Sequence, residues 1–151
     1  MSENWFRLIP TDPSYVPGES QRARAKRALR AILPGADAIE ADVFDQVEFV
    51  DPGPSNFESV ECPVCKAPLP MAWWQEAMDR AYKDHFIDLT ITTPCCSAVS
   101  NLNDLEYEWP AGFARFVLEA RSPGVPNLDP SDIADLEPVL GCSLRLVRAH
   151  H

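Results

Sequence analysis

The spacing of apolar and polar residues changes in the same order at the two ends of this chain, from a strand pattern to a helix pattern and back to a strand pattern. Residues 5–10 are mostly apolar and end at a proline, which indicates a short strand. In residues 19–33 alanine, leucine and isoleucine recur at helical spacing, and Pro34-Gly35 ends that helix. Residues 38–50 then alternate apolar and acidic side chains, which is typical of a half-buried strand. The pattern predicts strand, helix and strand.

A similar order returns in the last part of the chain. Residues 113–121 are rich in aromatic and branched side chains and are soon followed by a proline, which favours a strand, although their apolar positions also fit a helix. Residues 129–140 follow as a helix that Gly141 ends, and residues 144–147 give a last strand. We therefore predict a second unit of strand, helix and strand.

The two units together predict the fold. Two such units with right-handed crossovers pack as the split β-α-β sandwich that is called ferredoxin-like. We expect an α+β fold in which residues 1–56 and 111–151 form this sandwich. Residues 57–110 are then an insertion, and residues 51–56, which are rich in proline and glycine, form the connecting turn.

The insertion has a pattern of its own. Apolar residues recur every three or four positions in residues 70–86, which predicts an amphipathic helix through Phe86. Residues 87–92 and 105–109 alternate apolar and polar side chains and predict strands. Trp73 and Trp74 point about 100° apart on a helix, so both cannot enter the same core.

Four of the five cysteines lie in two short clusters inside the insertion. Cys62 and Cys65 frame a Cys-x-x-Cys turn, whereas Cys95 and Cys96 are adjacent. A zinc ion bound by four thiolates needs two ligand pairs on tight turns, and Cys-x-x-Cys meets this need. Adjacent ligands depart from that spacing and are strained. We predict one structural zinc per chain, held by Cys62, Cys65, Cys95 and Cys96, and interpret Cys142 as a small core residue.

Two alternatives to zinc stay open for these thiols. A disulfide needs an oxidising compartment, but the first residues contain no basic stretch followed by an apolar run, so we expect a cytoplasmic protein with reduced thiols. A redox Cys-x-x-Cys is expected at the start of a helix, whereas Leu69-Pro70 separates the first cluster from the predicted helix. His85 is a candidate further ligand, but its apolar helix face favours a packed core histidine.

The cysteine turns carry a resemblance to a known class of protein. Residues 62–69 and the turn at Cys95 and Cys96 resemble the knuckles of zinc-ribbon (zinc-knuckle) proteins, which often bind nucleic acid or protein. Residues 103–113 are similar to segments of uncharacterised bacterial proteins, to which no activity is attached. The resemblance implies a bound metal ion but no specific function.

Charge narrows the choice of partner. The formal net charge is −10, and residues 36–61 contain eight acidic side chains and no basic one. A nucleic-acid binder needs a basic surface, so we expect a protein partner instead, and in particular a basic one. This acidic segment and the edge formed by Trp73 and Trp74 are the candidate surfaces. No apolar stretch approaches the roughly 20 residues that span a bilayer, so we expect no membrane contact.

Catalytic patterns find little support in the chain. It contains no glycine-rich phosphate loop, no Ser/His/Asp order and no His-Glu-x-x-His motif, and four cysteine ligands would leave no open metal position. We expect no enzyme, no catalytic residue and no cofactor beyond zinc. The prediction is a small acidic protein-interaction module, such as an inhibitor or immunity-type protein. A nucleic-acid-binding zinc-ribbon regulator that uses the basic stripe at residues 22–30, and a thiol or redox enzyme, are the alternatives. Oligomeric state is left open.

Overall fold

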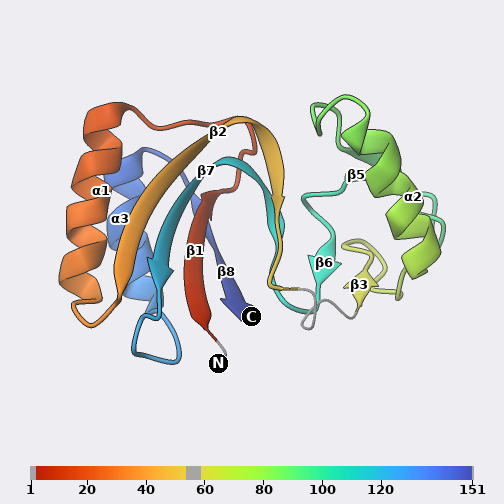
Figure 1. Ribbon diagram of the computed structural model, residues 1–151. Coiled ribbons are helices and arrows are strands. Elements are labelled where there is room, and N and C mark those ends of the chain that lie inside the picture. Colours follow the sequence, from red (N-terminus) through yellow and green to blue (C-terminus); the bar gives the residue numbers. More distant parts are fainter. Residues whose placement is uncertain (1–2, 54–58, 151) are drawn as a thin grey trace.

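The computed structural model describes residues 3–53 and 59–150 (Figure 1). The predicted connecting turn and the predicted start of the insertion fall partly on residues 54–58, which lie outside the described residues. The described residues form these elements in chain order: β1 (Asn4–Pro10), α1 (Glu19–Ile32), β2 (Ala38–Val50), β3 (Val60–Glu61), α2 (Met71–Tyr82), β4 (Thr90–Thr92), β5 (Val99–Asn101), β6 (Glu106–Tyr107), β7 (Gly112–Arg121), α3 (Pro130–Leu140) and β8 (Leu144–His150).

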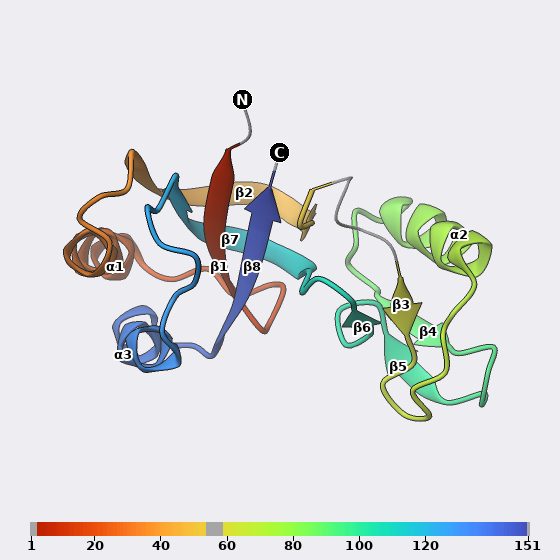
Figure 2. The same ribbon diagram turned by 90° about the horizontal axis from the view of Figure 1, so that it is seen from below.

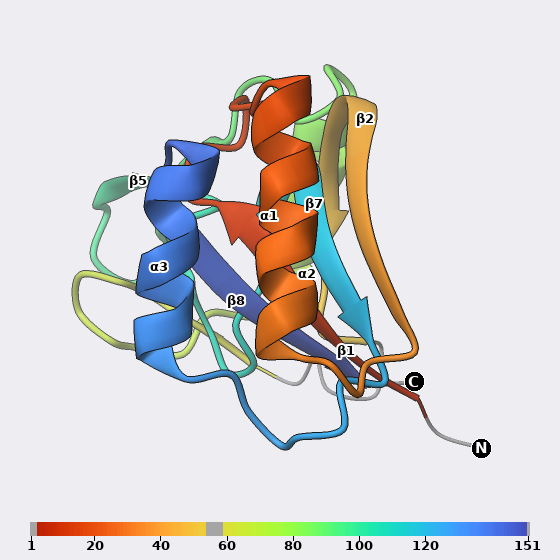
Figure 3. The same ribbon diagram turned by 90° about the vertical axis from the view of Figure 1, so that its left-hand side faces the viewer.

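Four strands from the two ends of the chain form one antiparallel sheet in the order β2-β7-β1-β8. β1 pairs with both β7 and β8, so strands from opposite ends of the sequence lie side by side. α1 and α3 lie next to each other on one face of this sheet (Figures 2 and 3). The fold is a mixture of helices and antiparallel sheet, which confirms the α+β class.

Local sequence explains where the two covering helices begin and end. The backbone N–H of Gly18 donates to Gln21 Oε1 at 2.6 Å, which caps the start of α1. The Asp129 carboxylate accepts the backbone N–H of Ser131 at 2.9 Å and caps α3. Gly141 ends α3 with a φ of 76°, a left-handed value that glycine adopts without a steric penalty.

A hydrophobic layer holds the helices against the sheet. Leu8, Phe116 and Leu118 on the sheet are fully buried, and Leu29 of α1 and Leu140 of α3 meet them in one cluster. Full burial of a side chain of this size contributes about 1.5–3 kcal/mol, so this layer is the main source of stability for the two chain ends.

Residues 113–121 form most of β7, so the strand interpretation of this ambiguous segment is confirmed. β7 is an inner strand of the sheet, between β2 and β1. Nearly all of its side chains are buried. The helices cover one face of the sheet, and a second apolar cluster, separate from the helical layer, buries Ala114 and Val117. A strand buried on both faces loses the polar alternation that identifies strands in a sequence, which is why its pattern also fitted a helix.

The insertion packs against one end of the sheet and shares a core with it. α2 lies beside the strand pairs β3-β6 and β4-β5. One hydrophobic cluster contains residues from α2, from these short strands and from the sheet. The ring centroid of Phe113 in β7 lies 5.1 Å from that of Phe86, and the centroid of Phe49 in β2 lies 5.9 Å from that of Trp74.

A buried polar network ties the insertion to the sheet in addition to these rings. Asn103 is only 4% exposed, and its Nδ2 donates to the Thr11 carbonyl at 3.0 Å. Its Oδ1 accepts the backbone N–H of Phe113 at 2.9 Å. Arg145 Nη1 donates to the carbonyls of Asn103 and Ala111, both at 2.9 Å. These bonds fix the insertion relative to β1, β7 and β8.

The predicted helix in the insertion is wrong in its extent. α2 ends at Tyr82, whereas the sequence pattern predicted a helix through Phe86. His85 and Phe86 adopt φ values of 58° and 62°, which no right-handed helix contains. The Asp84 carboxylate accepts the backbone N–H groups of Ile87 and Asp88 and stabilises this turn.

The predicted strands of the insertion also need correction in their extent. The strand expected over residues 87–92 is confined to β4, and the one expected over residues 105–109 is confined to β6.

Trp74 is buried, and its Nε1 donates to the Tyr107 hydroxyl at 3.3 Å. Trp73 is half-buried against the same cluster. Among the described residues no helix is both long and apolar enough to cross a membrane.

Candidate metal centre

The first cysteine turn is a tight loop that begins directly after β3. The backbone N–H of Lys66 donates to the Cys62 carbonyl at 3.0 Å, and the N–H of Cys62 donates to the Ala67 carbonyl at 2.9 Å. Lys66 has a φ of 64°, which reverses the chain. The N–H of Val64 points at Cys62 Sγ at 3.4 Å. The loop thus holds the sulfur atoms of Cys62 and Cys65 on the same side.

The second turn repeats this hydrogen-bond pattern between β4 and β5. The backbone N–H of Ser97 donates to the Thr93 carbonyl at 3.0 Å, and the N–H of Thr93 donates to the Ala98 carbonyl at 2.9 Å. Ser97 has a φ of 57°. Thr93 therefore occupies the place that Cys62 has in the first turn, and Cys96 occupies the place of Cys65. The adjacent Cys95 stands at a middle position of the turn.

The structure brings the four cysteines of the two clusters together. The sulfur atoms of Cys62, Cys65, Cys95 and Cys96 all lie within 4.8 Å of one another. Cys62 Sγ lies 3.8 Å from Cys96 Sγ, and Cys65 Sγ lies 3.3 Å from Cys95 Sγ. In a tetrahedral site with metal–sulfur bonds of about 2.3 Å the sulfurs are roughly 3.8 Å apart. The four thiols are therefore clustered at metal-binding distance.

None of these distances corresponds to a disulfide. A disulfide bond has a length of about 2.05 Å, and all five cysteines, which lie within the described residues, are free thiols. Cys142 is not a member of the cluster, and it is half-buried against the helical layer, so it lies at the border of the core and not, as predicted, within it. Burial, followed by the charges of Glu137 and Asp12, raises the pKa of the Cys142 thiol to about 11.

Protonation within the cluster is uneven. Hydrogen bonds from backbone N–H groups, with that of Cys65 contributing most, lower the pKa of the Cys62 thiol to about 6. Withdrawal from water, together with the neighbouring sulfurs of Cys65 and Cys62, raises the pKa of the Cys95 thiol to about 12. A thiolate at Cys62 is thus stabilised by the turn itself. A metal ion would have to displace the remaining thiol protons, so its affinity falls in acid.

The cluster stands at the surface of the insertion on a buried support. Cys62 is fully buried, whereas the other three cysteines are exposed. Val60 before the first turn and Leu69 after it belong to the core of the insertion, and the N–H of Leu69 donates to the Val60 carbonyl at 2.8 Å. Lys66 forms an ion pair with Glu106 on the neighbouring strand. These contacts support the first turn from the side of the core and from the neighbouring strand.

Thr93 is the residue of this centre that the sequence interpretation missed. It is 1% exposed, and its Oγ1 lies 3.4 Å from Cys96 Sγ and 3.2 Å from the backbone N of Ala98, which donates to it. Alignment of Thr-Pro-Cys-Cys-Ser-Ala with Cys-Pro-Val-Cys-Lys-Ala could have found it, because both turns share a proline and an alanine at the same positions. His85 is exposed and is not a member of the cysteine cluster, so its interpretation as a core histidine is wrong.

Comparison with known proteins adds no family to this geometry. No protein-family model, curated protein or solved structure matches the chain. The likeness to zinc-ribbon knuckles therefore depends on the two cysteine turns alone. These turns support a metal site and do not identify a family.

Proposed function

We propose that this protein binds one zinc ion through Cys62, Cys65, Cys95 and Cys96, and that this zinc is structural. The observation that carries the proposal is the convergence of four sulfur atoms from two separate turns. Four thiolates complete the tetrahedral coordination of zinc and leave no position for a substrate or water, so the site is suited to folding rather than to catalysis. On this basis we assign no enzymatic activity to the chain.

We further propose that the two chain ends are a ferredoxin-like sandwich with residues 57–110 as an inserted unit. The strand order β2-β7-β1-β8 and the position of α1 and α3 on one face support this topology. The shared hydrophobic cluster implies that the insertion is held against the sheet rather than tethered loosely to it.

The proposed function is that of a protein-interaction module that binds a basic partner. Four exposed carboxylates lie along β2, and we call them the β2 acidic surface: Glu40, Asp42, Asp45 and Glu48. Glu40 lies directly opposite Glu119 in the sheet, and like charges at such positions destabilise a strand pair. Arg7 pairs with Glu119 at 2.7 Å, yet burial, followed by the charges of Glu119 and Glu40, still raises the pKa of the neighbouring Asp42. Like charges that lower the stability of the free protein are expected at a surface where a basic partner neutralises them.

Burial of the tryptophans narrows the candidate interface. Trp74 contributes to the core of the insertion, so the edge formed by Trp73 and Trp74 offers one half-buried ring at most. The β2 acidic surface is therefore the better candidate. It fits an inhibitor or immunity-type protein that covers a basic surface of its target.

The alternative of nucleic-acid binding is less well supported. It would use the basic stripe of α1, but Arg22 Nη1 donates to the Pro17 carbonyl and Arg30 Nη1 donates to the Ala36 carbonyl, each at 2.6 Å. Arg22 and Arg30 of the basic stripe therefore also stabilise the fold. A redox role would require a pair of cysteines that is separate from the other two, whereas all four sulfurs form one cluster.

The test combines metal analysis with partner capture. Elemental analysis of reduced protein should give one zinc per chain, and the protein should capture a basic partner from its source organism. Charge reversal at Glu40, Asp42 and Glu48 should weaken that complex at least tenfold. The matched control reverses three exposed carboxylates elsewhere, at Glu76, Asp79 and Asp135. Equal affinity of both triple variants, or protein free of metal, would contradict the proposal.

A further inference from the structure

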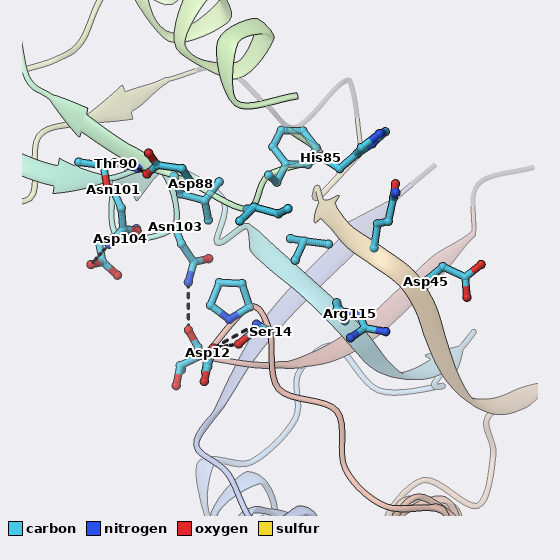
Figure 4. Close-up of a pocket in the computed structure, with 17 residues that line it drawn as sticks. Asp12, Ser14, Asp45, His85, Asp88, Thr90, Asn101, Asn103, Asp104 and Arg115 are labelled. Atoms are coloured by element: carbon cyan, nitrogen blue, oxygen red, sulfur yellow. Dashed lines mark hydrogen bonds between the residues drawn. The ribbon is translucent and has the colours of Figure 1, made fainter. Parts of the chain in front are cut away.

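A cleft of about 730 Å³ lies where the insertion meets the sheet (Figure 4). Its walls come from five parts of the sequence: the loop between β1 and α1, the irregular part of β2 between Val43 and Glu48, the loop that leads into β4, the end of β5 with the loop after it, and Arg115 of β7. The buried residues Phe86 and Asn103 are part of its lining. No cysteine is among the described residues that line it, so the cleft is separate from the metal centre.

Acidic side chains dominate the polar lining of the cleft. Its carboxylates are Asp12, Asp45, Asp88 and Asp104. In Figure 4 they come from different sides of the cleft, with Arg115 between them. With His85 neutral, the four aspartates and Arg115 give the described lining a formal charge of −3. Since Nε of Arg115 already donates to the Phe44 carbonyl at 3.1 Å, this arginine also supports the bulge of β2.

Apolar side chains accompany these charges. Val47 and Leu89 are half-buried in the lining. Phe86 is anchored in the core, and the left-handed turn at this residue leaves the next residue, Ile87, 82% exposed at the cleft. An isoleucine in water next to half-buried apolar groups forms a surface that another chain can cover.

The position of β2 favours an extended ligand over a compact one. β2 is the last strand of the sheet on this side, and its residues 45–47 line the cleft. These residues belong to the irregular part of β2, so we expect the cleft to bind the side chains of an extended segment rather than to add a strand to the sheet. Most of the lining residues are exposed, so the cleft is open enough for a chain to pass along it.

We propose that this cleft binds an extended segment of a partner protein in which lysine or arginine alternates with apolar side chains. The basic groups meet the four aspartates, and the apolar groups cover Val47, Ile87 and Leu89. The net charge of −10 steers such a segment toward the protein. The inference rests on the proposed function, because it names the class of partner segment and adds the cleft as a second contact beside the β2 acidic surface, with Asp45 common to both.

The test uses a defined probe rather than an unidentified partner. A fluorescently labelled octapeptide of alternating lysine and valine, blocked at both ends, is titrated with the zinc-loaded protein at about 0.15 M salt. Anisotropy should report binding, whereas the peptide with glutamate in place of lysine should not bind. Amide shift changes in a nitrogen-labelled sample should concentrate on residues that line the cleft. Affinity weaker than about 1 mM would overturn the proposal.

Matched variants separate the cleft from the β2 acidic surface. Replacement of Asp12, Asp88 and Asp104 by asparagine removes three charges from the cleft, and we expect the dissociation constant to rise about tenfold, since each exposed ion pair contributes a factor of a few. Replacement of Glu40 and Glu48 by glutamine and of Asp42 by asparagine removes three charges outside this set, and we expect less than a threefold change. Asp45 is left unchanged in both variants because it belongs to both surfaces.

The variants also distinguish failure of the cleft from failure of the proposed function. If only the second variant loses peptide, the cleft assignment is overturned while an interaction role on β2 stands. Ile87→Ser should weaken binding about threefold to fivefold without loss of folding, because Ile87 is exposed. Equal binding by spermine, or tighter binding by a single-stranded oligonucleotide, would also overturn the assignment to a protein segment.

Discussion

Exchange of ligands within the second cysteine turn tests the metal centre most directly. In the Cys62–Cys65 turn the predicted ligand Cys62 is the first residue. In the equivalent turn of β4 and β5 the first residue is Thr93, and the predicted ligand Cys95 is a middle residue. Cys95→Ser should therefore weaken zinc binding, and the added change Thr93→Cys should restore it. The reason for the rescue is geometric: Thr93 Oγ1 is already 3.4 Å from Cys96 Sγ, close to the 3.8 Å between the Cys62 and Cys96 sulfurs.

The size of the effect follows from the number of ligands. Structural zinc sites bind with an apparent free energy of about 10–16 kcal/mol at neutral pH, so one of four thiolates contributes roughly 3 kcal/mol. Loss of one thiolate should thus lower the affinity about a hundredfold, at about 1.4 kcal/mol for each factor of ten. The double variant should recover to within about tenfold of the original protein, since a sulfur returns but the Thr93 hydrogen bonds are lost.

The assay is competition with a chromophoric zinc chelator under reducing conditions, supported by cobalt substitution, whose absorption reports tetrahedral thiolate ligation. Cys142→Ser is the control, because Cys142 lies outside the cluster and should leave the affinity unchanged. Unchanged affinity in Cys95→Ser would show that Cys95 is no ligand. A double variant no better than the single one would refute the equivalence of the two turns.

Three further predictions concern the fold and its charges. Chelation of the metal should remove amide protection from residues 60–107 while the sheet keeps it, as measured by hydrogen exchange; uniform loss would argue against an inserted unit. Asn103→Ala should destabilise the protein by about 3 kcal/mol in urea denaturation, because it removes three side-chain hydrogen bonds that are buried or partly buried. Burial, then Glu119 and Glu40, raise the pKa of Asp42, so its ionised form is disfavoured in the folded state. Asp42→Asn should therefore stabilise the protein on the order of 0.5 kcal/mol at pH 7, and this gain should vanish as the pH falls through that pKa; a gain that persists in acid would contradict the assignment.

Much of the secondary structure follows from local periodicity. The strand at residues 38–50 and the helix at residues 19–33 are predicted nearly to their ends, because each has one buried and one more exposed side. The strand at residues 5–10 is short and apolar and ends at a proline, which is a local signal too. The end of α2 is different. His85 and Phe86 adopt left-handed conformations without glycine, and the aromatic contacts of Phe86 with Tyr82 and Phe113 hold them there. Such tertiary contacts leave no local signal in the sequence.

The two sites differ in how far the sequence reveals them. The four cysteines are visible because metal ligands on tight turns must stand close together in the chain. The cleft joins Asp12, Asp45 and Asp88, which lie far apart in the sequence and meet only through the packing of the insertion on the sheet. The acidic composition predicted a basic partner, but it could not place the contact, since solvent-exposed aspartates on strands and loops look alike in a sequence.

The hairpin of β4 and β5 links the two sites physically. Its turn carries Cys95 and Cys96, and at its open end Thr90 pairs with Asn101, both of which line the cleft. Two three-residue strands are too short to be stable alone, so the order of this hairpin depends on the metal and on the core beneath it.

Removal of the metal should therefore weaken the cleft as well as the cluster. We expect the lysine-valine octapeptide to bind at least tenfold more weakly to chelated protein, and added zinc to restore the affinity. Hydrogen exchange on the same sample must show that the sheet remains folded, so that the loss is local. Metal-free protein that has lost amide protection in the hairpin but keeps full peptide affinity would disprove the coupling, because a wall of the cleft would then be dispensable for binding.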